Sequence, residues 1–298
     1  MKFRGHETFY IRKGWLTKGL KRVNEFPNIF SDKDKNQMDE FGIGSNMVKA
    51  LRYWMIATGL TTEQFDKKIK VQLPTILGEL VNRYDRYLEE IGTLYLVHYE
   101  LAKNEDMATS WYHFFNGFNL TQFNKEDFVD DIKTYLSDQG EKVADRSLDD
   151  DFSCIINTYV SKSVISPGRI DPENLLDCPL GELKLISSVD SKKRIYKKNI
   201  VPVGSIPEFV FLAIIMDQKK DSDEIKIESL LKDKNNVGKV FNLDATTLMQ
   251  YLEQLKNKGL IDLVRTAGLD IIKVNRDLTY ENCIEDYYES LQIDGIRL

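Results

Sequence analysis

The sequence has 298 residues, of which 42% are hydrophobic and 30% are charged, and it carries 41 Lys and Arg against 47 Asp and Glu. This length suits two or three domains, and the composition is that of a globular protein, which excludes a disordered or collagen-like chain. No apolar run approaches the roughly 20 residues of a membrane helix, and MKFRGHETFY lacks the apolar core of a signal peptide. We therefore expect a cytoplasmic protein that does not contact a membrane.

Charge is distributed unevenly along the chain. Residues 1–70 contain 14 Lys and Arg against 8 Asp and Glu, whereas residues 71–298 contain 27 against 39. A basic N-terminal part on an acidic body is compatible with DNA binding at one end of the molecule. Neighbouring domains often differ by a few charges, so this pattern alone is a weak indication.

The N-terminal third has the outline of a helix-turn-helix. Residues 2–22 are basic and rich in aromatic residues, and they predict a strand or turn that leads into a helix. Residues 31–60 then predict a short helix, a turn at 42–44, and a longer helix with Ser45 as its N-cap.

The longer helix has one apolar face, which comprises Met47, Val48, Leu51, Trp54 and Met55. Four other residues are expected to point elsewhere: Asn46, Lys49, Arg52 and Tyr53. Two short alternating segments, 69–73 and 80–84, are the candidates for a wing hairpin.

The middle of the chain is predicted to be helical over 92–103, over 110–118, and from Asn124, where Asp127 follows in capping-box spacing. The charged segment 137–151 is the expected hinge. A helix is then expected to restart over 152–159, followed by irregular structure over 161–206, where four prolines are spread.

The last hundred residues predict a winged helix. The first expected helix is apolar and covers 209–218, with Ser205 as cap and Pro207 in the first turn. A second helix is expected over 228–232. Asp244 caps a third helix, which ends at Gly259. Residues 237–244 form the turn before the third helix, strands over 260–266 and 269–275 flank Ala267-Gly268 as a hairpin, and a final helix covers 280–291.

We therefore predict a mainly α fold with small β-hairpin wings, an α+β protein of several domains. An N-terminal winged-helix domain is expected over residues 1–90, a helical middle domain with an irregular linker over 91–200, and a C-terminal winged helix over 201–298.

Polar side chains near the start of a recognition helix can contact base edges in the major groove of DNA. In the first module these residues are Ser45, Asn46, Lys49 and Arg52. In the second module they are Ala245, Thr246, Thr247 and Gln250. The alternative is that the modules are platforms for protein contacts, and this alternative has more weight for the second module because its surroundings are acidic.

The stretch RGHETFYIRKGW is the most unusual one in the chain. His6 beside Glu7 can act as a general base or hold a metal, while Arg4, Arg12 and Lys13 can hold a phosphate. The alternative interpretation is a first segment that polar contacts hold in place. Both interpretations remain open on the sequence.

Metal and nucleotide chemistry have little support in the sequence. The three histidines form no HxxxH or HExxH pattern, and there is no Walker A loop, GxSxG or GxGxxG. A carboxylate-only magnesium site leaves no spacing signature, and Asp149, Asp150 and Asp151 would suit one. The more ordinary interpretation places these three aspartates at a helix N-terminus, where negative charge is favourable.

Several motifs occur in order along the chain: GHETFYIRKGWLTKGL, GIGSNMVKALRYWMIATGL, LGEL, GTLYLVHYELA, TSWYHFFNGF and DCPLGELKLI. Together they resemble the bacterial domain-of-unknown-function family 4007 over nearly the whole chain. Proteins of that family are similar to components found beside cysteine desulfurases and sulfurtransferase-like enzymes in DNA phosphorothioation loci. The resemblance implies a role in sulfur modification of the DNA backbone or in the linked anti-phage defence. The resemblance identifies no catalytic residue in this sequence.

The resulting expectation is a DNA-binding component of a phosphorothioation system, with double-stranded DNA and other proteins of the system as partners. One interpretation of the resemblance is a nickase that opens one strand for sulfur modification, with Mg²⁺ or Mn²⁺ as cofactor. The alternative is a non-enzymatic winged-helix adaptor or transcriptional regulator.

Overall fold

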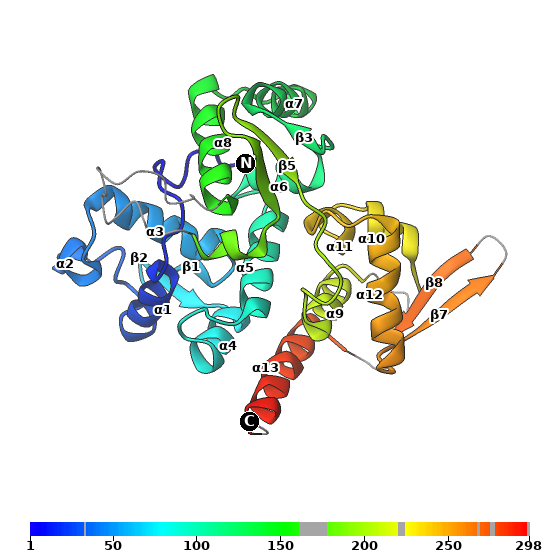
Figure 1. Ribbon diagram of the computed structural model, residues 1–298. Coiled ribbons are helices and arrows are strands. Elements are labelled where there is room, and N and C mark those ends of the chain that lie inside the picture. Colours follow the sequence, from blue (N-terminus) through cyan, green and yellow to red (C-terminus); the bar gives the residue numbers. More distant parts are fainter. Residues whose placement is uncertain (33, 161–177, 220–223, 267–268, 275–277, 297–298) are drawn as a thin grey trace. The chain divides into compact units, whose positions relative to one another are not determined.

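The computed structural model describes the chain except for residues 33, 161–177, 220–223, 267–268, 275–277 and 297–298. It is a mixed α+β structure, 53% helical, with small antiparallel sheets (Figure 1). The chain divides into two compact units. Unit 1 comprises residues 1–114 and 118–198, and unit 2 comprises residues 115–117 and 199–298.

Helices dominate unit 1. They are α1 Trp15–Glu25, α2 Gln37–Phe41, α3 Ser45–Ala57, α4 Ile76–Tyr84, α5 Ile91–Lys103, α6 Thr109–Asn116, α7 Lys125–Asp138, α8 Asp145–Tyr159 and the 3-10 helix η2 Pro179–Leu183. Helix α5 is apolar all round and buries nearly every residue, so it forms the centre of the unit. Helix α1 packs on α3, and α7 packs on α8.

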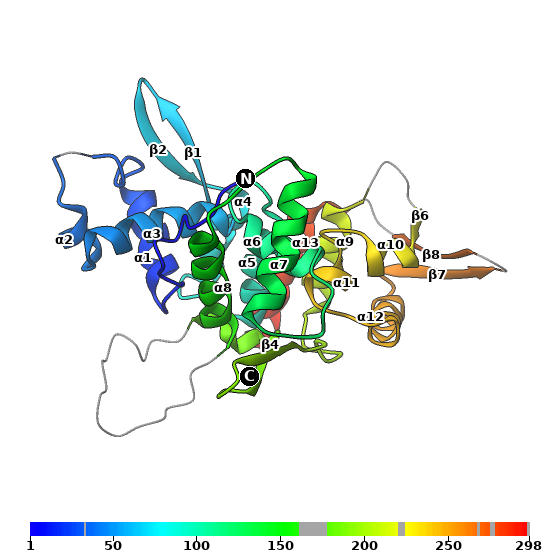
Figure 2. The same ribbon diagram turned by 90° about the horizontal axis from the view of Figure 1, so that it is seen from above.

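Two sheets belong to unit 1. The strands are β1 Thr61–Asp66, β2 Ile69–Pro74, β3 Gln122–Phe123, β4 Ile186–Asp190 and β5 Ile195–Lys198. The first sheet is the antiparallel hairpin β1–β2, which Figure 2 shows extending away from the helices of its unit. The second has the order β3-β5-β4. The sequence predicted irregular structure over 161–206, so β4 and β5 are a correction. Residues 161–177 of that range lie outside the described residues.

The expected helix-turn-helix segments are present, with three corrections. Gly44 is the N-cap of α3, and Ser45 is its first helical residue, because the backbone of Gly44 is still extended. Residues 80–84 belong to α4, which Thr75 caps, and the hairpin is instead β1–β2. Tyr53, expected outside the core face, is buried because the N-terminal segment packs over α3. A Cβ atom on Gly5 would lie 2.5 Å from the ring of Tyr53.

The middle helices agree with the sequence in position, and the capping box of Asn124 and Asp127 is present. The expected hinge over 137–151 is wrong in extent, because α8 begins at Asp145 and only residues 139–144 separate it from α7. Asp149, Asp150 and Asp151 therefore lie in the second turn of α8 and not at its N-terminus.

Unit 2 contains α9 Glu208–Asp217, α10 Ile227–Lys232, α11 Val237–Val240, α12 Ala245–Asn257 and α13 Tyr280–Ile296. Its strands are β6 Glu224–Lys226, β7 Ile261–Thr266 and β8 Leu269–Val274, in the order β6-β8-β7. Residues 210–216 of α9 are all buried, so this helix is the centre of the unit, with α12 and α13 packed on it.

Most local predictions for unit 2 are confirmed. Asp244 caps α12 by accepting a hydrogen bond from the Thr247 amide, and Gly259 ends it with a left-handed backbone, φ 69°. The N-cap of α9 is Pro207 and not Ser205, and the expected turn over 237–244 contains α11. Strands β7 and β8 pair as expected, while the Ala267-Gly268 turn lies outside the described residues.

The boundaries of the two units can be compared with the three expected domains. The segments expected as separate domains, 1–90 and 91–200, both fall largely in unit 1, and unit 2 begins at residue 199 apart from residues 115–117. The three-domain division stays a prediction. None of the helices in the described part of the chain has the length and apolar character needed to cross a membrane.

The α12 face offers a direct stability test. Leu252 is fully buried, so Leu252→Ala should lower the free energy of unfolding of the full chain by about 2–5 kcal/mol. Gln250→Ala, on the exposed face of the same helix, is the control and should change it by less than about 0.5 kcal/mol. Urea unfolding followed by circular dichroism measures both. Equal midpoints for the two variants would contradict this assignment of the helix face.

Candidate functional site

The N-terminal loop that precedes α1 has an unusual backbone. Three residues that are not glycine adopt left-handed conformations: Arg4 at φ 54°, Glu7 at 50° and Thr8 at 70°. Such conformations cost free energy and persist where surrounding contacts hold them. The contacts that hold this loop come from α8, α6 and α3.

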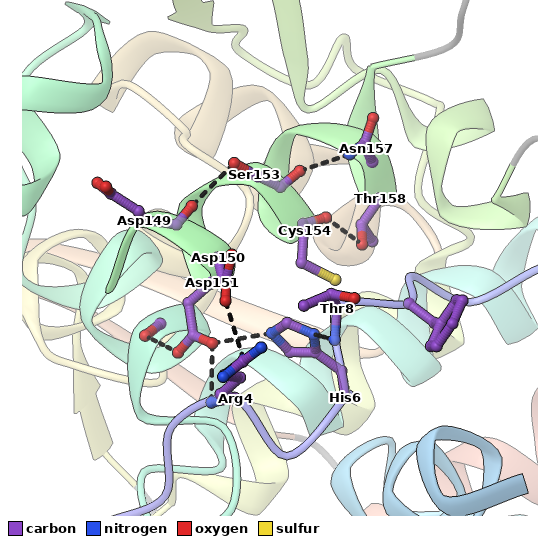
Figure 3. Close-up of polar contacts among 12 residues, drawn as sticks. Arg4, His6, Thr8, Asp149, Asp150, Asp151, Ser153, Cys154, Asn157 and Thr158 are labelled. Atoms are coloured by element: carbon purple, nitrogen blue, oxygen red, sulfur yellow. Dashed lines mark hydrogen bonds and ion pairs between the residues drawn. The ribbon is translucent and has the colours of Figure 1, made fainter. Parts of the chain in front are cut away.

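The central contact is a buried pair of His6 and Asp151 (Figure 3). The two side chains are 0% and 2% exposed, and Nε2 of His6 lies 2.8 Å from Oδ1 of Asp151. The same oxygen accepts the backbone N–H of Arg4 at 2.8 Å, and Oδ2 accepts the hydroxyl of Ser110 at 2.5 Å. Because a buried carboxylate is costly without partners, these three donors make the burial of Asp151 tolerable.

The second ring nitrogen of His6 defines the tautomer. The backbone N–H of Thr8 donates to Nδ1 of His6 at 3.1 Å, so Nδ1 is an acceptor. The ring hydrogen is therefore on Nε2, where it is donated to Asp151.

Aromatic side chains surround the pair. The ring of His6 stacks on Trp54 with centroids 5.9 Å apart and meets the edge of Trp111 at 5.6 Å. Trp54 also donates its indole N–H to the carbonyl of Phe9 at 2.9 Å. Burial, with a further contribution from the charge of Asp151, raises the pKa of Tyr53 well above its ordinary value. The site is thus a buried cluster that joins the N-terminal loop to α3, α6 and α8.

The structure separates the residues of the N-terminal motif into buried and exposed groups. His6 has no exposed surface, which favours the structural interpretation of this residue over direct contact with a substrate. Glu7 and Lys13 are exposed, and Arg4 pairs through Nε with Asp150 at 2.9 Å. Arg12 lies over the rings of Phe9 and Trp15. Catalysis by His6 and Glu7, and phosphate binding by Arg4, Arg12 and Lys13, stay predictions.

The predicted DNA-contacting residues of α3 differ in their environment. Ser45, Asn46 and Lys49 are exposed on its first turns, and Nζ of Lys49 lies 3.4 Å from Oδ1 of Asn46. Arg52 is only partly exposed and donates through Nε to Glu63 of β1 at 2.8 Å. The role that the structure gives Arg52 is to connect α3 to the hairpin.

Glu63 receives a second cation. Lys70 of β2 donates to its other carboxylate oxygen at 2.7 Å. Burial alone would raise the pKa of Glu63, but the hydrogen bonds from Lys70 and Arg52 lower it below its ordinary value. This carboxylate therefore stays charged near neutral pH and holds the hairpin against α3.

The tip of hairpin β1–β2 was not among the predicted contact residues. Lys67 and Lys68 form the turn with φ 45° and 76°, and both are exposed. Phe65 and Ile69 flank them and are 69% and 51% exposed. The signal was present as FDKKI, in which two lysines at a tight turn separate apolar residues, but the expected hairpin paired 69–73, which is β2, with 80–84.

The second predicted surface lies on α12 in unit 2. Ala245, Thr246 and Gln250 are exposed, and Thr247 is partly buried beside the cap. The first three line a shallow groove that also contains Met249, Glu253 and Gln254. The groove carries a carboxylate and no Lys or Arg among the described residues that line it.

Within the described part of the chain, histidines and carboxylates do not gather into a metal cluster. His113 pairs with Asp131 at 2.6 Å, and His98 lies 2.8 Å from the hydroxyl of Tyr159. Among the described residues, no group of three or more His, Cys, Asp or Glu side chains converges as a metal site would require. Asp149 lies near Lys125 at 3.3 Å, so the three consecutive aspartates of α8 point to different partners.

Fold and site together define a two-unit α+β protein, in which a buried histidine–aspartate pair holds an N-terminal loop beside a helix and a hairpin with exposed lysines. The chain matches the model of the family DUF4007, proteins of unknown function, over residues 3–288. It belongs to this family.

Two solved structures are similar to the chain over 99% of its length and 89% of theirs. One is described as "Magnesium ion-bound SspB crystal structure", with 25% identity and a TM-score of 0.82. The other is described as "SspB crystal structure", with 26% identity and a TM-score of 0.81. No match was found among curated proteins.

Removing the carboxylate of Asp151 tests its structural role. Asp151→Ala leaves His6 and Ser110 buried without their acceptor, so the free energy of unfolding should fall by about 3–5 kcal/mol. Asp149→Ala, two residues earlier on the same helix, removes only a partly exposed ion pair and should cost at most about 1 kcal/mol. Thermal and urea unfolding measure both. Equal losses would show that the buried pair is not what holds the loop.

Proposed function

We propose that this protein is the DNA-binding component of a bacterial DNA phosphorothioation system that serves anti-phage defence. Two findings support this assignment: the chain belongs to the family DUF4007, and it is similar to the SspB structures. The motif resemblance to that family is what implies a role in phosphorothioation. The observation that carries the DNA-binding part is the set of exposed cations on one helix and its adjoining hairpin, Lys49, Lys67 and Lys68.

In this proposal α1, α2, α3 and hairpin β1–β2 act as a winged helix. Asn46 and Lys49 on the first turns of α3 face the major groove, where an amide and an ammonium can contact base edges and phosphates. Lys67 and Lys68 at the hairpin tip contact the backbone, which releases counterions from the duplex. Glu63 fixes the angle between helix and hairpin through Arg52 and Lys70.

Unit 2 supports a different role within the same system. Its helices α9 to α12 and strands β6 to β8 have the element order of a second winged helix. The groove on α12 combines Met249 with Thr246, Gln250 and Glu253, and its described lining residues include no Lys or Arg to bind a phosphate. We propose that this surface contacts other proteins of the system, which is the adaptor function.

Metal-dependent nicking of one DNA strand is the second candidate function. The magnesium ion in one SspB structure favours it, as does the motif resemblance. The described residues gather no three-ligand cluster, so they do not fit a preformed metal cage, and we assign no residue as a ligand. In this candidate, cleavage gives the sulfur-transfer step access to a backbone phosphate.

The salt dependence of duplex binding tests the proposed surface. Lys49→Ala/Lys68→Ala should weaken binding and reduce the slope of log affinity against log salt by about 1.8, since each lost phosphate contact contributes about 0.9. Lys142→Ala/Arg146→Ala removes the same charge from exposed positions on other elements of unit 1 and is the matched control. Fluorescence anisotropy at several salt concentrations gives the slopes. Indistinguishable slopes for the two variants would remove α3 and its hairpin as the interface.

A plasmid assay separates the nickase from the adaptor. Purified protein is incubated with supercoiled plasmid, with and without Mg²⁺ or Mn²⁺. Nicking predicts open circles only with metal, and Glu7→Gln should then abolish cleavage but keep the gel shift if Glu7 is the general base. A gel shift without open circles in any condition supports the adaptor. Equal cleavage by the wild-type protein and Glu7→Gln would end the role proposed for Glu7.

A further inference from the structure

A second basic site lies in unit 1, on elements that the proposed interface does not use. A pocket of about 460 Å³ opens between the start of α7, the outer face of α8 and hairpin β4–β5. Lys125, Lys193 and Arg194 line it together with Tyr196 and Asn157. Among the described residues that line the pocket, Glu126 alone carries a carboxylate.

The hairpin concentrates positive charge. Residues 192–198, KKRIYKK, hold five basic residues and no acidic one in a chain of net charge -6. Lys198 is used internally, because Nζ donates to the carbonyls of Phe114 and Phe118 at 2.6 Å each. The other four are exposed, and no ion pair joins them to a carboxylate within the part of the chain that the structure describes: Lys192, Lys193, Arg194 and Lys197.

The side chain of Asp190 holds the turn that presents these cations. Oδ1 of Asp190 accepts the backbone N–H groups of Lys192 and Lys193 at 2.9 and 3.0 Å. These bonds fix the backbone and leave the ammonium groups free to contact a ligand. Arg194 completes the turn in a left-handed conformation, φ 53°.

Tyr196 adds a fixed aromatic surface to the pocket. It is partly buried, pairs across the sheet with Phe123, and lies with its ring centroid 6.2 Å from that of Phe123 and 6.1 Å from that of Phe152. The ring is therefore held in place before a ligand arrives. An aromatic ring beside cations that are not neutralised is the combination that binds single-stranded nucleic acid, since unpaired bases stack and phosphates need counter-charge.

We propose that this pocket binds a single-stranded segment of DNA, with phosphates at Lys193 and Arg194 and a base on Tyr196. The inference rests on the proposed function, that the protein binds DNA. A single strand is favoured over a duplex because a base inside a duplex cannot offer its face to a side chain. The duplex interface and the single-strand pocket then belong to the same unit, so a strand released from the duplex has a binding site on the same protein.

The test uses the full chain, a labelled oligothymidylate and a duplex of the same length in fluorescence anisotropy. Lys193→Ala/Arg194→Ala should weaken single-strand binding and lower its log-log salt slope by about 1.4, at about 0.7 for each phosphate contact. Tyr196→Leu should weaken it at least about five-fold, and Tyr196→Phe should restore it, because stacking needs the ring and not the hydroxyl. Duplex binding should be unchanged in all three variants.

Lys192→Ala/Lys197→Ala is the matched control, since it removes the same charge from the same hairpin outside the pocket. Equal weakening by the two double variants would show that the loss of binding comes from net charge, and it would contradict binding in the pocket. Thymidine monophosphate that competes as well as the oligonucleotide would also overturn it, because the site would then bind free nucleotides. If the wild-type protein binds the duplex but not the oligonucleotide, the single-strand site is contradicted and the proposed function stands. If it binds neither, the proposed function is contradicted as well.

Discussion

The carboxylate of Asp151 is the group on which the arrangement of unit 1 depends. It accepts hydrogen bonds from the His6 ring, the Arg4 backbone and the Ser110 hydroxyl, and so it joins the N-terminal loop to α8 and α6. His6 in turn stacks on Trp54 of α3. An unpaired charge at this depth would be prohibitively costly, so loop, α3, α6 and α8 hold one another in a single arrangement. Within the most unusual sequence motif of the chain, His6 and the backbone of Arg4 thus have a structural role.

Local chemistry made much of the fold predictable from the sequence. The caps at Asn124 and Asp244 depend on residues a few positions apart, and they specify the starts of their helices correctly. Asp151 was not predictable in this way. Its partner His6 is 145 positions away, and a run of three aspartates is ordinarily exposed.

The candidate surfaces show the same division. The exposure of Asn46 and Lys49 was predictable because helical periodicity separates them from the apolar face of α3. Arg52 was predicted by the same argument, but it is paired with Glu63 from a strand. Alternation located β2 at 69–73 but paired it with 80–84 in place of the preceding β1, and hairpin β4–β5 was not expected. The exposed cations of the two hairpins were therefore missed, although both lysine-rich turns are visible in the sequence.

We propose that duplex DNA binds to α3 and hairpin β1–β2 of unit 1. Hydrogen–deuterium exchange of the full protein with and without a DNA duplex tests it most directly, because backbone amides report contact without any substitution. The duplex is expected to slow exchange in residues 44–50 and 65–70 and to leave exchange in α12 unchanged. Slower exchange confined to α12 and hairpin β7–β8, with residues 44–50 and 65–70 unaffected, would contradict it.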